Sequence, residues 1–298
     1  MSDARVDVGD ASAMTVGWVL LTMGDRPTEL AAAIDSIRLM RSDVPVCVVV
    51  NGADHLPIAD NHPDVTVIAS EENLGVPGGR DLGVQRMAAD LVFFLDDDAR
   101  IIDEGLMKRS VDHFVDDRAL AAISFHLVDE DGATARRHVP RLGRGDADRS
   151  GPVATFLGGA SVVRRSTYVE AGGYWPELRY GHEELDLSWR MLDCGGTIFY
   201  DAESTVFHPR TDIARHADGW FRTGRNRSLV ARRNLPWPLH IVHVASWSAL
   251  GTLRAPGGDA RRAFLDGVRA GWRESDVRSP MSWKTVWRLC RLRRPPIL

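Results

Sequence analysis

Short apolar segments alternate with helical patterns in the first hundred residues. The apolar segments are rich in β-branched and aromatic residues, which is typical of buried strands. They cover residues 14–21, 44–50, 65–69 and 91–95. Residues 28–40 carry apolar residues at helical spacing, and Pro27 is well placed at the start of that helix. This alternation predicts a mostly parallel sheet with right-handed helical crossovers.

The pattern changes after residue 98. A glycine-rich loop at 72–83 has by then entered a helix that ends near residue 89. We next expect a helix over 103–117, a hairpin of strands 120–128 and 134–139, an apolar segment over 153–163 and a short helix over 165–171. The predicted fold class is therefore α/β, with a sheet that starts parallel and then gains antiparallel strands.

Three consecutive carboxylates, Asp96, Asp97 and Asp98, directly follow the apolar segment 91–95. Ligands of open α/β sheets bind at the carboxyl ends of the strands. Neighbouring carboxylates repel one another unless a cation joins them, and hard divalent cations prefer carboxylate oxygens. The alternative is a cap on the following helix, for which one aspartate suffices. The triplet therefore favours a metal site that holds a diphosphate.

A second acidic group lies in the segment 180–190. On a helix, Glu183, Asp186 and Arg190 share one face, and Asp186 stands four residues before Arg190, which predicts a structural ion pair. Glu184 points about a quarter-turn away. Glu183 and Glu184 occupy the first turn, where the helix dipole favours negative charge. Two interpretations stay open here: helix capping, or a general base at the mouth of a site.

Composition is that of a globular protein, with 44% hydrophobic and 26% charged residues in 298 positions. Three widely spaced cysteines indicate a reducing compartment, so we expect a cytoplasmic protein. The acidic, polar start of the chain is unlike a signal peptide, and we expect residues 1–13 to be disordered. No apolar run approaches the ~20 residues that cross a bilayer.

Charge is divided sharply along the chain. Residues 1–203 carry 19 basic and 35 acidic side chains, whereas residues 204–298 carry 18 basic and six acidic ones, together with six of the nine tryptophans. We expect helices at about 239–253, 259–273 and 281–292. Interleaved Arg and Trp suit the anionic inner face of the plasma membrane. The basic helices could equally dock on the acidic domain; nucleic acid is not an expected partner.

Six motifs follow one another in an order that resembles family 2 glycosyltransferases of the GT-A fold, including rhamnosyl- and galactofuranosyltransferase-like bacterial enzymes. They are Thr22–Arg26, Asn73–Gly79, Leu95–Asp98, Gly158–Ala160, Gly172–Tyr174 and Glu183–Asp186. The resemblance covers about residues 14–235 and leaves 236–298 as a basic, Trp-rich helical extension. No dinucleotide-binding or P-loop glycine motif is present.

The resemblance implies an inverting enzyme with a nucleoside-diphosphate sugar as donor, a divalent metal (Mn or Mg), and a glycan, glycolipid or other hydroxyl acceptor. It assigns the donor to Thr22, Gly24, Arg26, Asn51, Asn73, Gly79, Arg80, Asp96 and Asp97. Val50 stands where the family often has an aspartate that grips the nucleobase, so the donor base stays open. The sequence also leaves the oligomeric state open.

The remaining roles are implied in the same way. Asp96, Asp98 and His208 resemble the metal ligands, Glu184 takes the place of the catalytic base, and Glu183 orients it or touches the acceptor. The acceptor would meet Gly159, Trp175 and His182, although for Trp175 the sequence favours core packing. Two other functions remain for comparison: a nucleotidyltransferase acting on sugar phosphates, and a non-catalytic sugar- or lipid-binding protein.

Overall fold

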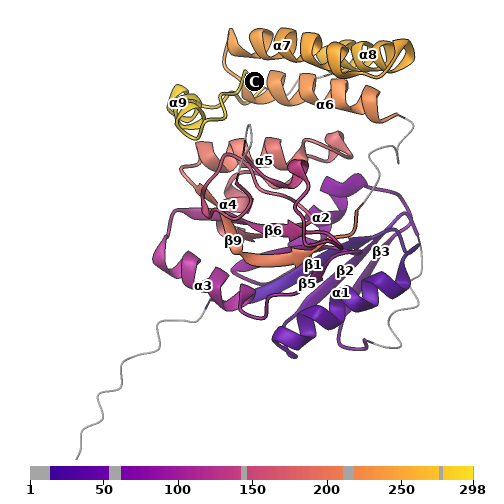
Figure 1. Ribbon diagram of the computed structural model, residues 1–298, viewed down its shortest axis with the longest axis vertical. Helices are drawn as coiled ribbons and strands as arrows, with labels where there is room; N and C mark the ends of the chain where they lie inside the picture. Colours follow the sequence, from indigo (N-terminus) through magenta and orange to yellow (C-terminus); the bar gives the residue numbers. More distant parts are fainter. Residues whose placement is uncertain (1–13, 54–61, 142–145, 211–217, 275–277, 298) are drawn as a thin grey trace, which may run out of the picture.

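The computed structural model describes residues 14–53, 62–141, 146–210, 218–274 and 278–297. The expected disorder of residues 1–13 lies outside the described residues. The fold is a mixed sheet flanked by helices, with a layer of further helices above it (Figure 1). Two apolar cores lie on the two faces of the sheet. Helices α1 (Pro27–Met40) and α3 (Leu106–Asp116) contribute to one, and α2 (Gly75–Arg86), α4 (Arg165–Glu170) and α5 (Glu183–Asp193) contribute to the other.

The described sheet has the strand order β3-β2-β1-β4-β8-β6-β9-β5, and β7 pairs with β9. Its strands are β1 (Val16–Thr22), β2 (Val46–Asn51), β3 (Thr66–Ser70), β4 (Leu91–Asp96), β5 (Arg100–Ile101), β6 (Leu120–Val128), β7 (Gly151–Pro152), β8 (Ala160–Arg164) and β9 (Thr197–Phe207). The first four strands along the chain pair in parallel. Antiparallel pairing begins where β8 joins β4. The predicted change from parallel to mixed pairing after the acidic triplet is confirmed.

The glycine-rich segment was predicted as a loop over 72–83 that enters a helix ending near residue 89. The helix is confirmed, but it already begins at Gly75 and ends at Arg86. Its glycines let α2 lie close against β1: a Cβ on Gly79 would come within 2.3 Å of Leu21, and one on Gly83 within 2.3 Å of Val19. Helix packing, and not backbone flexibility, therefore explains these two glycines.

The predicted hairpin strand at 134–139 is wrong. That segment contains a short 3₁₀ helix, η2 (Arg136–His138). Strand β6 already has a neighbour on each side, because β8 and β9 pair with it, so no edge remains for a hairpin partner. Strand β9 was not anticipated from the sequence, and the only strand within 153–163 begins at Ala160.

The basic C-terminal part folds into the expected helices: α7 (Leu239–Arg254), α8 (Gly258–Glu274) and α9 (Trp283–Arg291). Together with α6 (Gly219–Asn234), α7 and α8 form a layer over α5 (Figure 1). Glycines let α6 and α8 meet closely, since a Cβ on Gly224 would lie 2.2 Å from the backbone oxygen of Phe264. Each helix among the described residues is too short or too polar to cross a bilayer.

A buried carboxylate joins this layer to the sheet domain. Asp186 on α5 is fully buried and accepts hydrogen bonds from Arg190 at 2.5 Å and from Asn234 of α6 at 2.7 Å. Arg233 of α6 lies 3.3 Å from the same carboxylate. The predicted Asp186–Arg190 pair is thus confirmed, and it extends into a network that fixes α6 on α5.

We predict that Asp186→Ala destabilises the protein by about 3–5 kcal/mol, because the buried guanidinium of Arg190 then lacks its carboxylate partner. Asp112→Ala is the matched control: its exposed pair with Lys108 contributes about 0.5 kcal/mol or less. Denaturant unfolding of both variants gives the two free energies. Equal, small losses would show that the network does not hold α6 in place.

Candidate functional site

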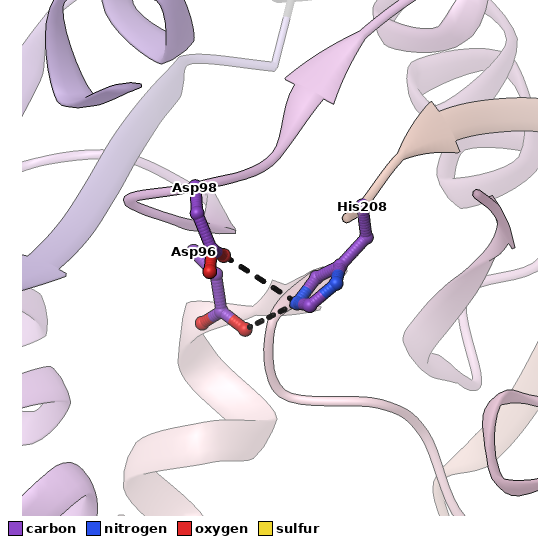
Figure 2. A group of neighbouring side chains, drawn as sticks. All are labelled: Asp96, Asp98 and His208. Atoms are coloured by element: carbon purple, nitrogen blue, oxygen red, sulfur yellow. Dashed lines mark ion pairs between the residues drawn. The ribbon is translucent and has the colours of Figure 1, made fainter. Parts of the chain in front are cut away.

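Two carboxylates and one imidazole converge at the carboxyl end of β4 (Figure 2). Asp96 ends β4, Asp98 follows it in the turn, and His208 comes directly after β9. The Nε2 atom of His208 lies 3.6 Å from Oδ2 of Asp96 and 3.5 Å from Oδ1 of Asp98. One ligand atom from each residue lies within 4.8 Å of the others. The pairing of β5 with β9 brings His208 to this edge.

The charges of the triad formed by Asp96, Asp98 and His208 interact strongly. Burial would lower the pKa of His208, but its hydrogen bond to Asp96 and the charges of both carboxylates raise that pKa to about 9. Burial opposes ionisation of Asp96, yet His208 and Arg80 hold the pKa of this carboxyl below its usual range. The carboxylate therefore stays in the ionised form that binds a cation.

Asp97 points toward the loop after β1. It accepts a hydrogen bond from the Thr22 hydroxyl at 2.8 Å and one from Arg26 at 3.3 Å. Burial raises the pKa of Asp97 to about 6. Arg26 also donates to Asp98 at 2.5 Å, and Gly24, with a φ of 80°, donates its amide to the Thr22 hydroxyl at 3.0 Å. The loops after β1 and β4 are thus locked together.

Arg80 connects the triad to α5. This side chain is buried and donates to Oδ1 of Asp96 at 2.8 Å and to Oε1 of Glu184 at 3.2 Å. One guanidinium therefore lies between a carboxylate of the triad and the glutamate that the sequence places in the catalytic position. It compensates both negative charges, which would otherwise repel each other across the site.

Two glycines make this close approach possible. A Cβ on Gly158 would lie 2.0 Å from Nη1 of Arg80 and 2.2 Å from Oε1 of Glu184. A Cβ on Gly159 would lie 2.0 Å from Oδ2 of Asp96. These side chains pack directly over the bare backbone between β7 and β8, so any larger residue would displace them.

Two neighbouring glutamates begin α5 and have different surroundings. Glu183 is 3% exposed, and within the described part of the chain its Oε2 has no hydrogen-bond partner. Burial and the charge of Glu184 raise the pKa of Glu183 to about 8. Glu184 is only partly buried and faces Arg80. His182 precedes them in a left-handed conformation, with a φ of 73°. Glu184 is thus the better placed of the two to meet a substrate.

Several other residues singled out in the sequence are engaged in structural contacts beside the site. Asn51 donates to Asn73 at 3.2 Å and accepts from the Leu74 amide at 2.7 Å, which fixes the start of α2. Trp175 is half-buried. The Cζ atom of Arg233 lies over its ring, 4.4 Å from the ring centre. Binding roles for these residues stay predictions.

His138 is a neighbour of the triad that sequence reasoning missed. Its ring centre lies 5.5 Å from that of His208, and burial together with the His208 charge lowers the pKa of His138 to about 4. It lies on η2, in the segment that was assigned to a strand. No motif or spacing in the sequence marks this residue, because only the fold brings η2 to the end of β9.

Relatives and solved structures give a consistent picture. The chain is 23% identical over 202 residues to the pre-mycofactocin glycosyltransferase of Mycobacterium tuberculosis (64% of this chain, 42% of that protein). It is 24% identical over 180 residues to the O-antigen chain rhamnosyltransferase RfbN of Salmonella typhimurium (55% of this chain, 57% of that protein). The chain thus spans about half the length of these curated relatives.

The fold is shared with solved transferases. GalNAc-T7, solved with UDP, GalNAc and Mn²⁺, matches with a TM-score of 0.63 at 15% identity, over 89% of this chain and 57% of that one. The mannosyltransferase PcManGT of Pyrobaculum calidifontis, solved with GDP-Man and Mn²⁺, matches with a TM-score of 0.57 at 15% identity. The match covers 94% of this chain and 80% of that one. TarS of S. aureus, solved with UDP-GlcNAc, matches with a TM-score of 0.59 at 10% identity, over 85% of this chain and 79% of that one.

The family model for glycosyl transferase family 2 matches residues 19–172, just over half of the chain. This stretch runs from β1 to the end of α4 and contains Asp96, Asp98, Arg80 and the Gly158–Gly159 pair. The chain therefore belongs to glycosyl transferase family 2.

Proposed function

We propose that the protein transfers a sugar from a nucleoside-diphosphate donor to a hydroxyl group of a glycan or glycolipid acceptor, with inversion at the anomeric carbon. One observation carries the proposal: Arg80 bridges Asp96 of the triad and Glu184 of α5. A metal-binding carboxylate and a candidate base thus share one guanidinium. The GDP-Man of PcManGT, the UDP-GlcNAc of TarS, the UDP of GalNAc-T7 and the RfbN relative support the substrate classes.

A divalent cation fits the triad. Carboxylate and imidazole ligands suit Mn²⁺ and Mg²⁺. Because Gly159 has no Cβ, the carboxylate of Asp96 can lie directly against its backbone. Asp96, Asp98 and His208 would hold the ion, and His208 would release its proton on binding, since only the neutral imidazole is a ligand. Such an ion neutralises charge that develops on a departing diphosphate. Arg26, beside Asp98, would add a guanidinium that pairs well with phosphate oxygens.

Glu184 is the proposed general base. It would accept the proton of the acceptor hydroxyl while that oxygen attacks the anomeric carbon from the face opposite the leaving diphosphate. Such help contributes typically ~10²–10⁴ in rate. A single displacement of this kind inverts the anomeric centre and needs no covalent intermediate. Glu183, buried behind it, is proposed to orient it.

The donor is proposed to lie along the carboxyl ends of β1, β2 and β4. Thr22, Gly24 and Arg26 line the first loop, and Asn51 and Asn73 the second. A nucleotidyltransferase would place a Gly-rich, basic loop directly after β1, where this chain has the short segment Thr22–Arg26. A binding protein would have no use for a base opposite the metal ligands.

We also propose that residues 236–298 form an extension that contacts an anionic membrane surface through α9. Val286 and Leu289 face α5 and are buried. On the neighbouring face Trp283 and Trp287 are 51% and 68% exposed, one turn apart, with Lys284 beside them. Residues 278–297 contain six basic and no acidic side chains. Tryptophan beside basic residues is typical of membrane-surface helices.

Glu184→Gln keeps the shape of the side chain and removes the base. We expect transfer to fall by about 10²–10⁴ while donor binding survives. The measurement is a transfer assay with a panel of nucleoside-diphosphate sugars in the presence of Mn²⁺, with Glu104→Gln, an exposed position on the same domain, as control. Undiminished transfer by Glu184→Gln would refute the assignment of the base.

Gly159→Ala places a methyl group where Oδ2 of Asp96 now lies. Because Asp96 must move, we expect Mn²⁺ affinity to fall at least about tenfold, measured by titration calorimetry. Gly257→Ala is the matched control, since nothing lies within 4 Å of a Cβ at Gly257. If both variants bind Mn²⁺ like the parent protein, the ion is held elsewhere.

Trp283→Ala/Trp287→Ala tests the membrane proposal in a liposome sedimentation assay. We expect the full-length protein to sediment with anionic vesicles at low salt, less at high salt, and the double variant to lose most of this binding. Leu253→Ala, 79% exposed on α7, should behave like the parent protein. Absence of binding by the parent protein at low salt would contradict the proposal.

A further inference from the structure

Two guanidinium groups converge on one tryptophan in the helical layer. The Cζ atom of Arg227, on α6, lies 3.4 Å from the ring centre of Trp247 on α7. The Cζ atom of Arg254, at the end of α7, lies 5.5 Å from the same ring. The indole Nε1 of Trp247 is buried and has no hydrogen-bond partner in the described part of the chain.

A third guanidinium belongs to the same cluster. Arg294, in the segment after α9, is partly buried, as is Arg227. Burial, followed by the charges of Arg294 and Arg254, lowers the pKa of Arg227 to about 9. The segment that carries Arg294 also contacts α7 directly, because Nδ1 of His243 donates a hydrogen bond to the Pro296 carbonyl and the His243 ring centre lies 6.2 Å from that of Trp247.

No carboxylate from the described residues forms an ion pair with Arg227, Arg254 or Arg294. Arg225, two positions before Arg227 on the same helix, shows the usual arrangement, because it pairs with Glu274 at 2.6 Å. Partly buried guanidinium groups without counter-charges are costly, since they lose hydration and gain no partner.

The cluster lies where the helical layer meets α5. His243, one turn before Trp247 on α7, also has its ring centre 6.1 Å from that of Trp189 on α5. The charge of Arg227, after burial, also lowers the pKa of His182, which directly precedes α5. The cluster and the candidate base Glu184 are therefore connected through the same helix.

Guanidinium and indole groups donate hydrogen bonds and accept none. Three guanidinium groups from three segments, with an unpaired indole N–H among them, suit an anion with several oxygens and more than one charge. We propose that Arg227, Arg254 and Arg294 around Trp247 form a binding site for a phosphate or diphosphate group. Resting on the proposed transferase function, this group belongs to the acceptor and holds its hydroxyl near Glu184.

Titration calorimetry of the full-length chain with inorganic pyrophosphate, in the presence of EDTA, tests the site. Without a cation, the acidic triplet repels the probe, so binding reports on the basic cluster. We expect saturable binding that weakens at least about tenfold in Arg227→Gln and in Arg294→Gln, because each removes a charge-assisted contact. Arg262→Gln, exposed on α8, should bind like the parent protein.

Absence of binding by the parent protein, or equal weakening in Arg262→Gln, would overturn the proposal. Arg254→Gln, at an exposed position at the end of α7, removes the third guanidinium and remains informative if Arg227→Gln unfolds in a thermal melt. Geranyl diphosphate and inorganic pyrophosphate distinguish the two sources of the anion. Tighter binding of the prenyl form indicates a group carried by a lipid acceptor, and equal binding indicates a free anion.

The site and the proposed function fail separately. Pyrophosphate binding is measured without donor or turnover, so its loss in Arg294→Gln stands whether or not Glu184 acts as a base. Conversely, an active enzyme whose parent form does not bind pyrophosphate would retain the transferase function and lose the anion site.

Discussion

Electrostatic repulsion at the end of β4 is the constraint around which the molecule is arranged. Three successive carboxylates there are stable only because cations reach them from three other segments: Arg26 from the loop after β1, Arg80 from α2 and His208 from the end of β9. Each of these segments is held against the strand by sheet pairing or close helix packing. The sheet thus serves to bring opposite charges to one edge.

Helix α5 transmits this arrangement to the rest of the protein. Its first turn carries Glu184 toward Arg80, and its middle carries Asp186 into the network that fixes α6. Because both residues lie on α5, a shift of the helical layer would be transmitted to Glu184, the proposed base. A division into a sheet domain and a basic extension is useful as a description, but α6 packs with the layer as well as with α5.

The sequence predicted what depends on local pattern. An apolar run followed by carboxylates located β4 and two members of the candidate metal cluster, and helical spacing located α7, α8 and α9. It could not predict contacts that only pairing creates: β9 escaped notice, and residues 134–139 were assigned to a strand although β6 has no free edge. His208 was found through resemblance alone, and His138 was not found. Only the structure explains the glycine at position 158, because Arg80 and Glu184 occupy the space that a Cβ would need.

The account depends on a cation at Asp96, Asp98 and His208. Anomalous diffraction at the manganese edge, from crystals grown with Mn²⁺ and a nucleoside diphosphate, tests this most directly. The account predicts one strong peak within bonding distance of Asp98 and His208, with diphosphate oxygens on its other side. A peak elsewhere, or a bound diphosphate with no metal between it and these side chains, would contradict it.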